Sequence, residues 1–165
     1  MKKTFILKTL IDILYFLHIL GLSAILYKLP FGIDNINQGN LNIEEWSILH
    51  WNNLLFSIFS YIAFLIGLFY LRKLARFLLS KKHFTDAIII SLKKCGIFFM
   101  SSGIIHILLF SILWFAKLCN GKFELSYNTN SMFPLFLIII GLFFTIQSKT
   151  LLLAKGIKEE NDLTV

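Results

Sequence analysis

The chain has 165 residues, of which 57% are hydrophobic and 15% charged, and its net charge is +7. A soluble domain is about 45–50% apolar and about 25% charged, and a fold of this size has too little interior to hide so many apolar side chains. An ordinary water-soluble domain is therefore excluded. The basic charge lies in short segments between apolar runs, which indicates membrane orientation, so we expect no direct nucleic acid binding.

Four apolar windows are each long enough to cross a bilayer as a helix, which takes about 20 residues. They cover residues 4–27, 54–71, 96–116 and 133–153. The first window follows two lysines, as a signal peptide would, but it is long and contains Asp12 and His18, and no small-residue cleavage site closes it. We expect it to be retained. The predicted fold is all-α, a single integral membrane domain over residues 1–165 with four transmembrane helices.

The basic residues predict how this bundle is oriented. Thirteen of the 16 Lys and Arg residues lie near the two termini or in the loop of residues 72–94. Because basic residues favour the cytoplasmic side of a membrane, both termini and this loop are predicted to be cytoplasmic. The three tryptophans then fall near the outer boundary, where aromatic anchors are common.

The first charged pair in the predicted helices is Lys8 and Asp12. They are four residues apart on the first helix and are expected to pair with each other. Lys149, near the inner end of the fourth helix, is expected to complete a cluster that joins these two helices. Such a cluster is more typical of structure than of proton or ion transfer.

His18 and His106 are predicted to lie at similar depth, near the midplane of two helices that run in the same direction. Two such imidazoles suit bis-histidine ligation of haem b between helices. The alternative is that each histidine bonds a neighbouring backbone carbonyl or a hydroxyl group, such as that of Ser101 or Ser102.

The loop between the second and third windows has helical patterns on both sides of a break at residues 80–83. Its first part extends the second helix. After the break, Thr85 has the chemistry of an N-cap, and Asp86 stands in the first turn, where the helix dipole favours negative charge. We predict a helical elbow on the inner membrane surface. Its basic side chains suit anionic lipid, with an acidic or nucleic-acid partner as the alternative: Arg72, Lys73, Arg76, Lys81 and Lys82.

The chain closes on the polar segment GIKEENDLTV, residues 156–165. Gly156 is predicted to end the fourth helix, which makes residues 154–165 a cytoplasmic tail. A short acidic and apolar segment suits docking either on the basic elbow of the same chain or on a soluble partner, and a solvated tail is a third option. The candidate docking residues of the tail are Glu159, Glu160, Asp162 and Leu163.

The sequence contains none of the common catalytic or phosphate-binding motifs. Cys95 and Cys119 stand at opposite ends of one predicted helix, about 36 Å apart, so they cannot form a disulfide within the chain. Two lone thiols also provide no metal site. We therefore expect a protein that is not an enzyme and that has no catalytic or metal-ligating residues.

The order of these features resembles a known family. The Lys-rich start, the four apolar helices, the segment HFTDAIIISLKKCG and the closing EENDLTV together are similar to the small four-span bacterial membrane proteins catalogued as domain of unknown function 2975. The resemblance covers essentially the whole chain and brings no site residues with it. It implies a multi-pass protein of the bacterial cytoplasmic membrane. Members often stand beside a gene for a small helix-turn-helix transcription regulator, which implies a membrane partner for such a regulator.

These observations predict a non-enzymatic membrane protein that binds a cytosolic regulator through the inner loop and the acidic tail. No cofactor is expected in that case. Two alternatives come from other classes: a b-type haem protein in electron transfer that uses His18 and His106, and a small transporter or an accessory subunit of one. A homo-oligomer in the lipid bilayer is compatible with all three.

Overall fold

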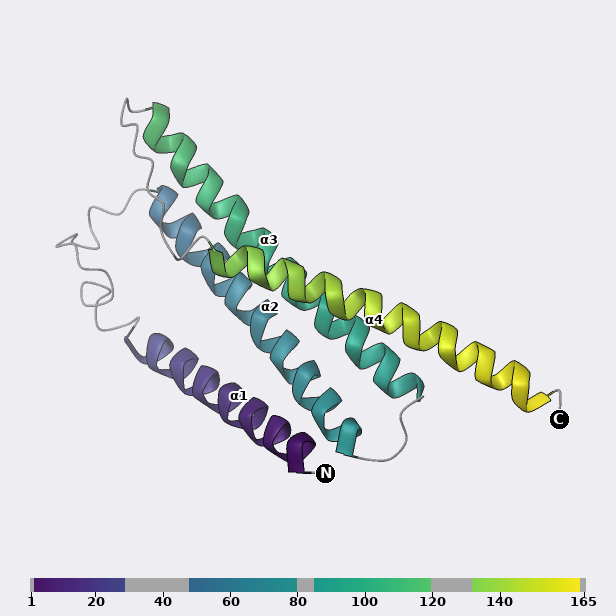
Figure 1. The fold of residues 1–165 in the computed structure, drawn as a ribbon. Coiled ribbons are helices and arrows are strands. Elements are labelled where there is room, and N and C mark those ends of the chain that lie inside the picture. Colours follow the sequence, from purple (N-terminus) through teal and green to yellow (C-terminus); the bar gives the residue numbers. More distant parts are fainter. Residues whose placement is uncertain (1, 29–47, 80–84, 120–131, 164–165) are drawn as a thin grey trace.

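The structure is a computed structural model of the chain and describes residues 2–28, 48–79, 85–119 and 132–163. These residues form four helices. In chain order they are α1 (Lys2–Lys28), α2 (Ile48–Leu79), α3 (Asp86–Cys119) and α4 (Met132–Leu163) (Figure 1). Each helix is long and apolar enough to cross a membrane. The predicted all-α bundle of four membrane helices is thereby confirmed.

The predicted elbow consists of the end of one long helix, α2, and the start of another, α3. α2 continues to Leu79 and α3 starts at Asp86, so both extend well beyond the apolar windows. The backbone N–H groups of Ile88 and Ile89 donate to the carbonyl oxygen of Thr85 at 3.0 and 3.3 Å. Thr85 therefore holds the cap position expected from its sequence, and Asp86 stands in the first turn as predicted.

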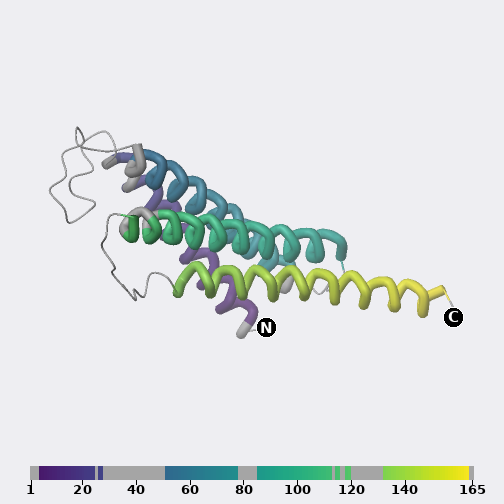
Figure 2. The backbone as a smooth tube through the Cα atoms, turned by 90° about the horizontal axis from the view of Figure 1, so that it is seen from above, coloured from purple at the N-terminus to yellow at the C-terminus, as the bar shows by residue number. Residues whose placement is uncertain are grey.

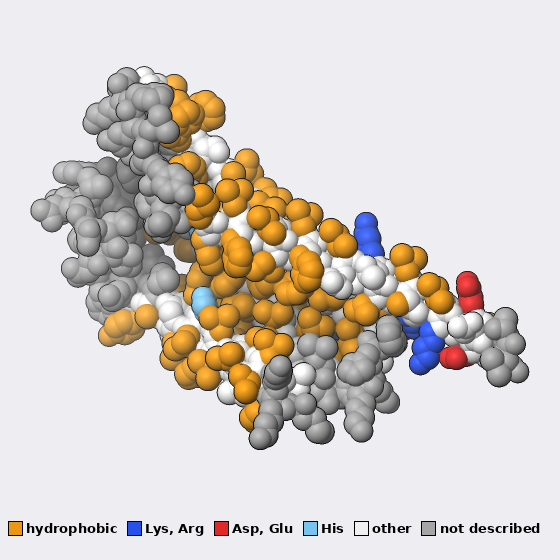
Figure 3. Space-filling model, in the orientation of Figure 1, with side chains coloured by type: hydrophobic (Ala, Val, Ile, Leu, Met, Phe, Trp, Pro, Cys, Tyr) orange, Lys and Arg blue, Asp and Glu red, His pale blue; other side chains and the backbone are white. Residues whose placement is uncertain are grey.

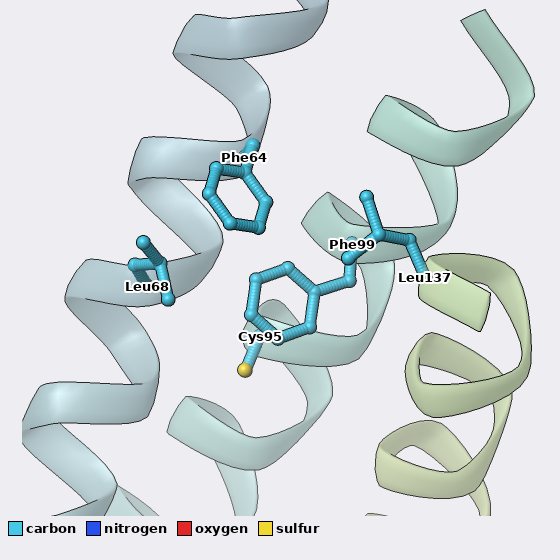
Figure 4. Packing of buried hydrophobic residues seen from close by; sticks show 5 residues of the cluster. All are labelled: Phe64, Leu68, Cys95, Phe99 and Leu137. Carbon is cyan, nitrogen blue, oxygen red and sulfur yellow. The ribbon is translucent and has the colours of Figure 1, made fainter. Parts of the chain in front are cut away.

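The helices make their main contacts in chain order, α1 with α2, α2 with α3, and α3 with α4. The core lies where α2, α3 and α4 meet. Figure 4 shows five of its buried side chains, Phe64 and Leu68 from α2, Cys95 and Phe99 from α3, and Leu137 from α4. The rings of Phe64 and Phe99 stack with centroids 5.7 Å apart. By contrast, little of α1 is buried.

Glycines bring the backbones of α3 and α4 into contact. A Cβ atom on Gly141 would lie 2.7 Å from the carbonyl oxygen of Gly96 and 2.8 Å from the backbone nitrogen of Met100. Further along α3, a Cβ atom on Gly103 would lie 2.6 Å from the carbonyl oxygen of Pro134. Small residues permit such close approach of membrane helices. These contacts set the register, with Gly96 beside Gly141 and Gly103 beside Pro134.

This register displaces α4 along the bundle. From Gly103, α3 continues to Cys119 beyond the start of α4, a length of about 24 Å. At the other end, α4 continues past Lys155, which contacts Asp86 at the start of α3. Both views of the chain show the C-terminal end of α4 reaching beyond α2 and α3 (Figures 1 and 2). We call this projecting part, residues 156–163, the α4 arm.

The prediction that Gly156 ends the fourth helix is wrong, because α4 is helical as far as Leu163. A glycine inside a helix costs about 1 kcal/mol relative to alanine, which does not by itself stop a helix. Lys155 and Glu159, four residues apart with Nζ and Oε1 at 3.4 Å, bracket the glycine with an ion pair. The predicted tail is therefore an extension of the membrane helix.

Candidate functional site

The inner surface of the bundle gathers the charged side chains on which the docking prediction rests. It comprises residues 72–79 of α2, 85–94 of α3 and 155–163 of α4. In Figure 3, apolar side chains cover most of the visible helix surface, and the blue and red charged groups lie toward the C-terminal end of α4. The charged side chains visible on this face thus gather at the end where α4 projects.

One ion pair at the base of the α4 arm joins α4 to the start of α3. The Lys155 ammonium donates to Oδ1 of Asp86 at 2.7 Å. Asp86 is in the first turn of α3, where a carboxylate is favoured by the helix dipole. We predicted that acidic groups of the tail would meet basic groups of the elbow. In this contact the signs are reversed, because the tail provides the lysine and the elbow provides the carboxylate.

Arg72, the first basic residue of the predicted docking set, is engaged within the chain. Its Nε donates to Oδ1 of Asp12 at 2.5 Å, and its guanidinium carbon lies 5.3 Å from the ring centroid of Tyr15. Asp12 was expected to pair with Lys8 in a cluster with Lys149, and this expectation is wrong. Since α1 packs on α2, Asp12 faces the cation of the neighbouring helix, which can approach it head-on.

The other members of the docking set have different surroundings. The Lys73 ammonium lies 5.9 Å from the centroid of Phe77 on its own helix, and Arg76 is exposed in the last turn of α2. Lys81 and Lys82 lie outside the described residues. All four predicted tail residues are on the surface of the helical arm: Glu159, Glu160, Asp162 and Leu163.

The two histidines of the haem hypothesis both contact α2. Nδ1 of His18 is 2.8 Å from the Leu14 carbonyl oxygen on its own helix, and its ring centroid lies 5.1 Å from that of Phe64. Tyr61 donates its hydroxyl to the His18 carbonyl oxygen at 3.0 Å. The bond to Leu14 uses Nδ1, which makes Nε2 the ring nitrogen suited to a metal, as in many metal-ligating histidines. Haem ligation between His18 and His106 stays a prediction.

His106 belongs to a hydrogen-bonded cluster that the sequence did not indicate. Its Nδ1 lies 2.6 Å from Oγ of Ser60 in α2. The same Oγ is 3.0 Å from the carbonyl oxygen of Ser102 and 3.1 Å from the Ser102 hydroxyl. Ser60 is 0% exposed and Ser102 is 2% exposed. A serine this deeply buried cannot reach a substrate, so the pair of Ser60 and His106 is a structural bond between α2 and α3.

Two determinants of this arrangement escaped sequence reasoning. Ser60 stands in an apolar window with no charged neighbour, and its hydrogen bonds to another helix are what give it a role. The glycine contacts had a weak signal, the seven-residue spacing of Gly96 and Gly103, which returns to the same helix face. That spacing predicts a face of α3 on which another helix packs, but it does not indicate which helix that is.

Four long apolar helices joined by buried polar contacts and glycine seams define the chain as a multi-pass membrane protein. It belongs to the family described as protein of unknown function (DUF2975), whose model matches residues 37–165. The resemblance drawn from the sequence is confirmed. The match includes α2, α3 and α4 and begins after α1. No curated protein and no solved structure matched the chain.

Proposed function

We propose that this protein holds a soluble regulator at the membrane, using the inner surface and the α4 arm as its docking site and performing no catalysis itself. The observation that carries the proposal is the helical arm. Ile157 is 63% exposed and Leu163 is 87% exposed, and Glu159 and Asp162 stand among them. Apolar side chains beside carboxylates on a projecting helix are suited to a groove with a basic rim.

The order of the arm supports this use. An eight-residue peptide would be marginal as an isolated helix. The α4 arm, however, is the last part of a 32-residue helix, and Lys155 in that helix is bonded to Asp86. A partner that binds a helix already formed loses less conformational entropy on association. The resemblance to the family suggests a small helix-turn-helix regulator as that partner.

The test measures binding of the regulator encoded beside this gene to the full chain in bilayer nanodiscs of neutral lipid. We expect Ile157→Ala to weaken binding about tenfold, because one apolar anchor is worth about 1–2 kcal/mol. Ile139→Ala is the matched control, since Ile139 is also 63% exposed but lies in the membrane part of α4. A chain that stops after Lys155 should lose binding. Equal affinities for all four proteins would refute the docking role of the arm.

A further inference from the structure

The interior face of α2 and α3 changes character along its length. We call the end where α2 begins and α3 ends the distal end; it is the predicted outer end. Farther from the distal end, this face is apolar, with Phe64, Leu68 and Phe99 buried. Toward the distal end the same stripe of α2 continues through Ser60, Ser57 and Asn53, at spacings of three and four residues. On α3 it continues from Ser102 to His106.

The hydrogen positions of the His106 cluster follow from counting donors. The Ser60 hydroxyl has one hydrogen, and the carbonyl oxygen of Ser102 can only accept, so that hydrogen belongs to this 3.0 Å bond. The Ser102 hydroxyl and Nδ1 of His106 must then each donate to the Ser60 oxygen. Nδ1 of His106 therefore carries a hydrogen, and in the neutral ring Nε2 is an acceptor with a lone pair.

The position of His106 along α3 makes it costly to leave this lone pair without a hydrogen bond. The residue stands 20 positions after Asp86 and 13 before Cys119 on α3, about 30 Å and about 20 Å along the helix. An apolar layer of about 30 Å placed anywhere along α3 therefore includes His106 or meets it at its edge. The ring is nonetheless exposed on the protein surface. A polar atom in such a layer costs several kcal/mol, of the order of a lost hydrogen bond, unless a donor meets it.

The fold leaves this stripe uncovered by the fourth helix. Pro134 of α4 lies against Gly103 and α4 begins two residues earlier, so α4 starts about level with His106 and the rest of α3 extends past it. On the facing helix, Ser57 and Asn53 are half-buried, which leaves part of each side chain accessible. Three polar side chains thus lie along one side of the α2–α3 pair, between the closed Ser60–Ser102 contact and the distal end.

We infer that the distal halves of α2 and α3 form a polar site that is open to water from the distal side. In it, Nε2 of His106 accepts a hydrogen bond from an O–H group, with Ser57 and Asn53 along the same path. The ligand class is a neutral O–H donor, either water itself or the hydroxyl group of a small neutral solute. This site is separate from the inner surface, so a test of it does not depend on whether the proposed docking function is correct.

Cysteine accessibility in the full chain tests the site. In a Cys119→Ser background, which keeps the buried Cys95, we compare Ser57→Cys with Phe59→Cys. Phe59 lies on the exposed apolar side of α2. A membrane-impermeant, charged thiol reagent applied from the distal side should label Ser57→Cys at least about tenfold faster, because only a hydrated thiol forms the reactive thiolate. Equal, slow labelling of both positions would overturn the inference.

A second measurement needs no substitution. Magnetisation transfer from water in solid-state NMR of the histidine-labelled wild-type chain should reach the His106 ring strongly and the buried Leu68 side chain weakly. Glycerol then separates the two sources of the O–H group. If it slows labelling at Ser57→Cys, a small hydroxyl solute can occupy the site; if it has no effect, water alone does. A dry His106 ring in this experiment would contradict the proposal regardless of how the variants fold.

Discussion

At the scale of single residues, the polar side chains inside the bundle act as connections between helices. Ser60 accepts two hydrogen bonds and donates one, all to α3. In a membrane such bonds average about 0.6 kcal/mol each, because the unassembled helices also find partners for their polar groups. Three bonds converging on one oxygen make Ser60 the most connected polar atom of the α2–α3 contact.

Replacing Ser60 by alanine should therefore lower the free energy of unfolding by about 1–2 kcal/mol, since it leaves three groups of α3 without their partner. Ser101→Ala is the control, because the Ser101 hydroxyl bonds only the Phe98 carbonyl oxygen of its own helix. Unfolding of both variants in mixed micelles by a denaturing detergent measures the difference. If the two substitutions cost the same, the interhelical cluster contributes no stability.

The sequence was informative about single residues only where their partners were local. The cap at Thr85 and the first-turn Asp86 were predictable because their partners lie within four residues. Asp12 was assigned to Lys8 for the same reason, yet its partner Arg72 is 60 residues away. A pairing across helices depends on which faces meet, and a single sequence does not contain that information.

At the scale of the elements, helix existence was predictable and helix register was not. Hydropathy and length identified all four helices, because a bilayer requires long apolar segments. If both windows crossed the same apolar layer, residues 96–116 would lie alongside residues 133–153 over their whole length. The structure places Gly96 beside Gly141, about a third of the way along α4, since that is where two backbones without side chains can touch. Packing thus decides the register.

Two glycines of α4 should respond in opposite ways to substitution. Gly141→Val should destabilise the fold by about 2 kcal/mol or more, because its side chain would meet backbone atoms of α3 at less than 3 Å. At Gly156 no atom lies within 4 Å of an added Cβ, so Gly156→Ala should slow hydrogen exchange in the arm, by up to about 1 kcal/mol of local stability. Hydrogen exchange of both variants checks the pair. Exchange in the arm that is faster after Gly156→Ala would show that the glycine is needed there.

At the scale of the whole molecule, α1 is a peripheral element. Ile11 is its one buried residue within the part of the chain that the structure describes. Its polar attachments include the Asp12–Arg72 pair and the bond from Tyr61 to the His18 carbonyl oxygen. The family model begins at residue 37, after this helix. The helices that pack most closely, α2, α3 and α4, are therefore also the ones that the family model matches.

A chain beginning at residue 37 should consequently keep the arrangement of α3 and α4. Asp86→Cys with Lys155→Cys, in a background without Cys95 and Cys119, should be joined by a short bismaleimide crosslinker in both the full and the shortened chain. Asp86→Cys with Ile139→Cys is the control that should not react, because Ile139 lies on the far side of the Gly96–Gly141 contact. Loss of the crosslink in the shortened chain would show that α1 holds α3 and α4 together.

The contact of Gly96 with Gly141 has a mechanical consequence. It is a pivot about a third of the way along the 32-residue helix α4, and the longer side ends at Leu163. The distance from Gly141 to Leu163 is about 33 Å, so a rocking of about 10° at the pivot would swing the tip through about 6 Å. A small movement at this contact is thereby magnified at the α4 arm, where the proposed partner would bind. Such a swing must break the Lys155–Asp86 ion pair.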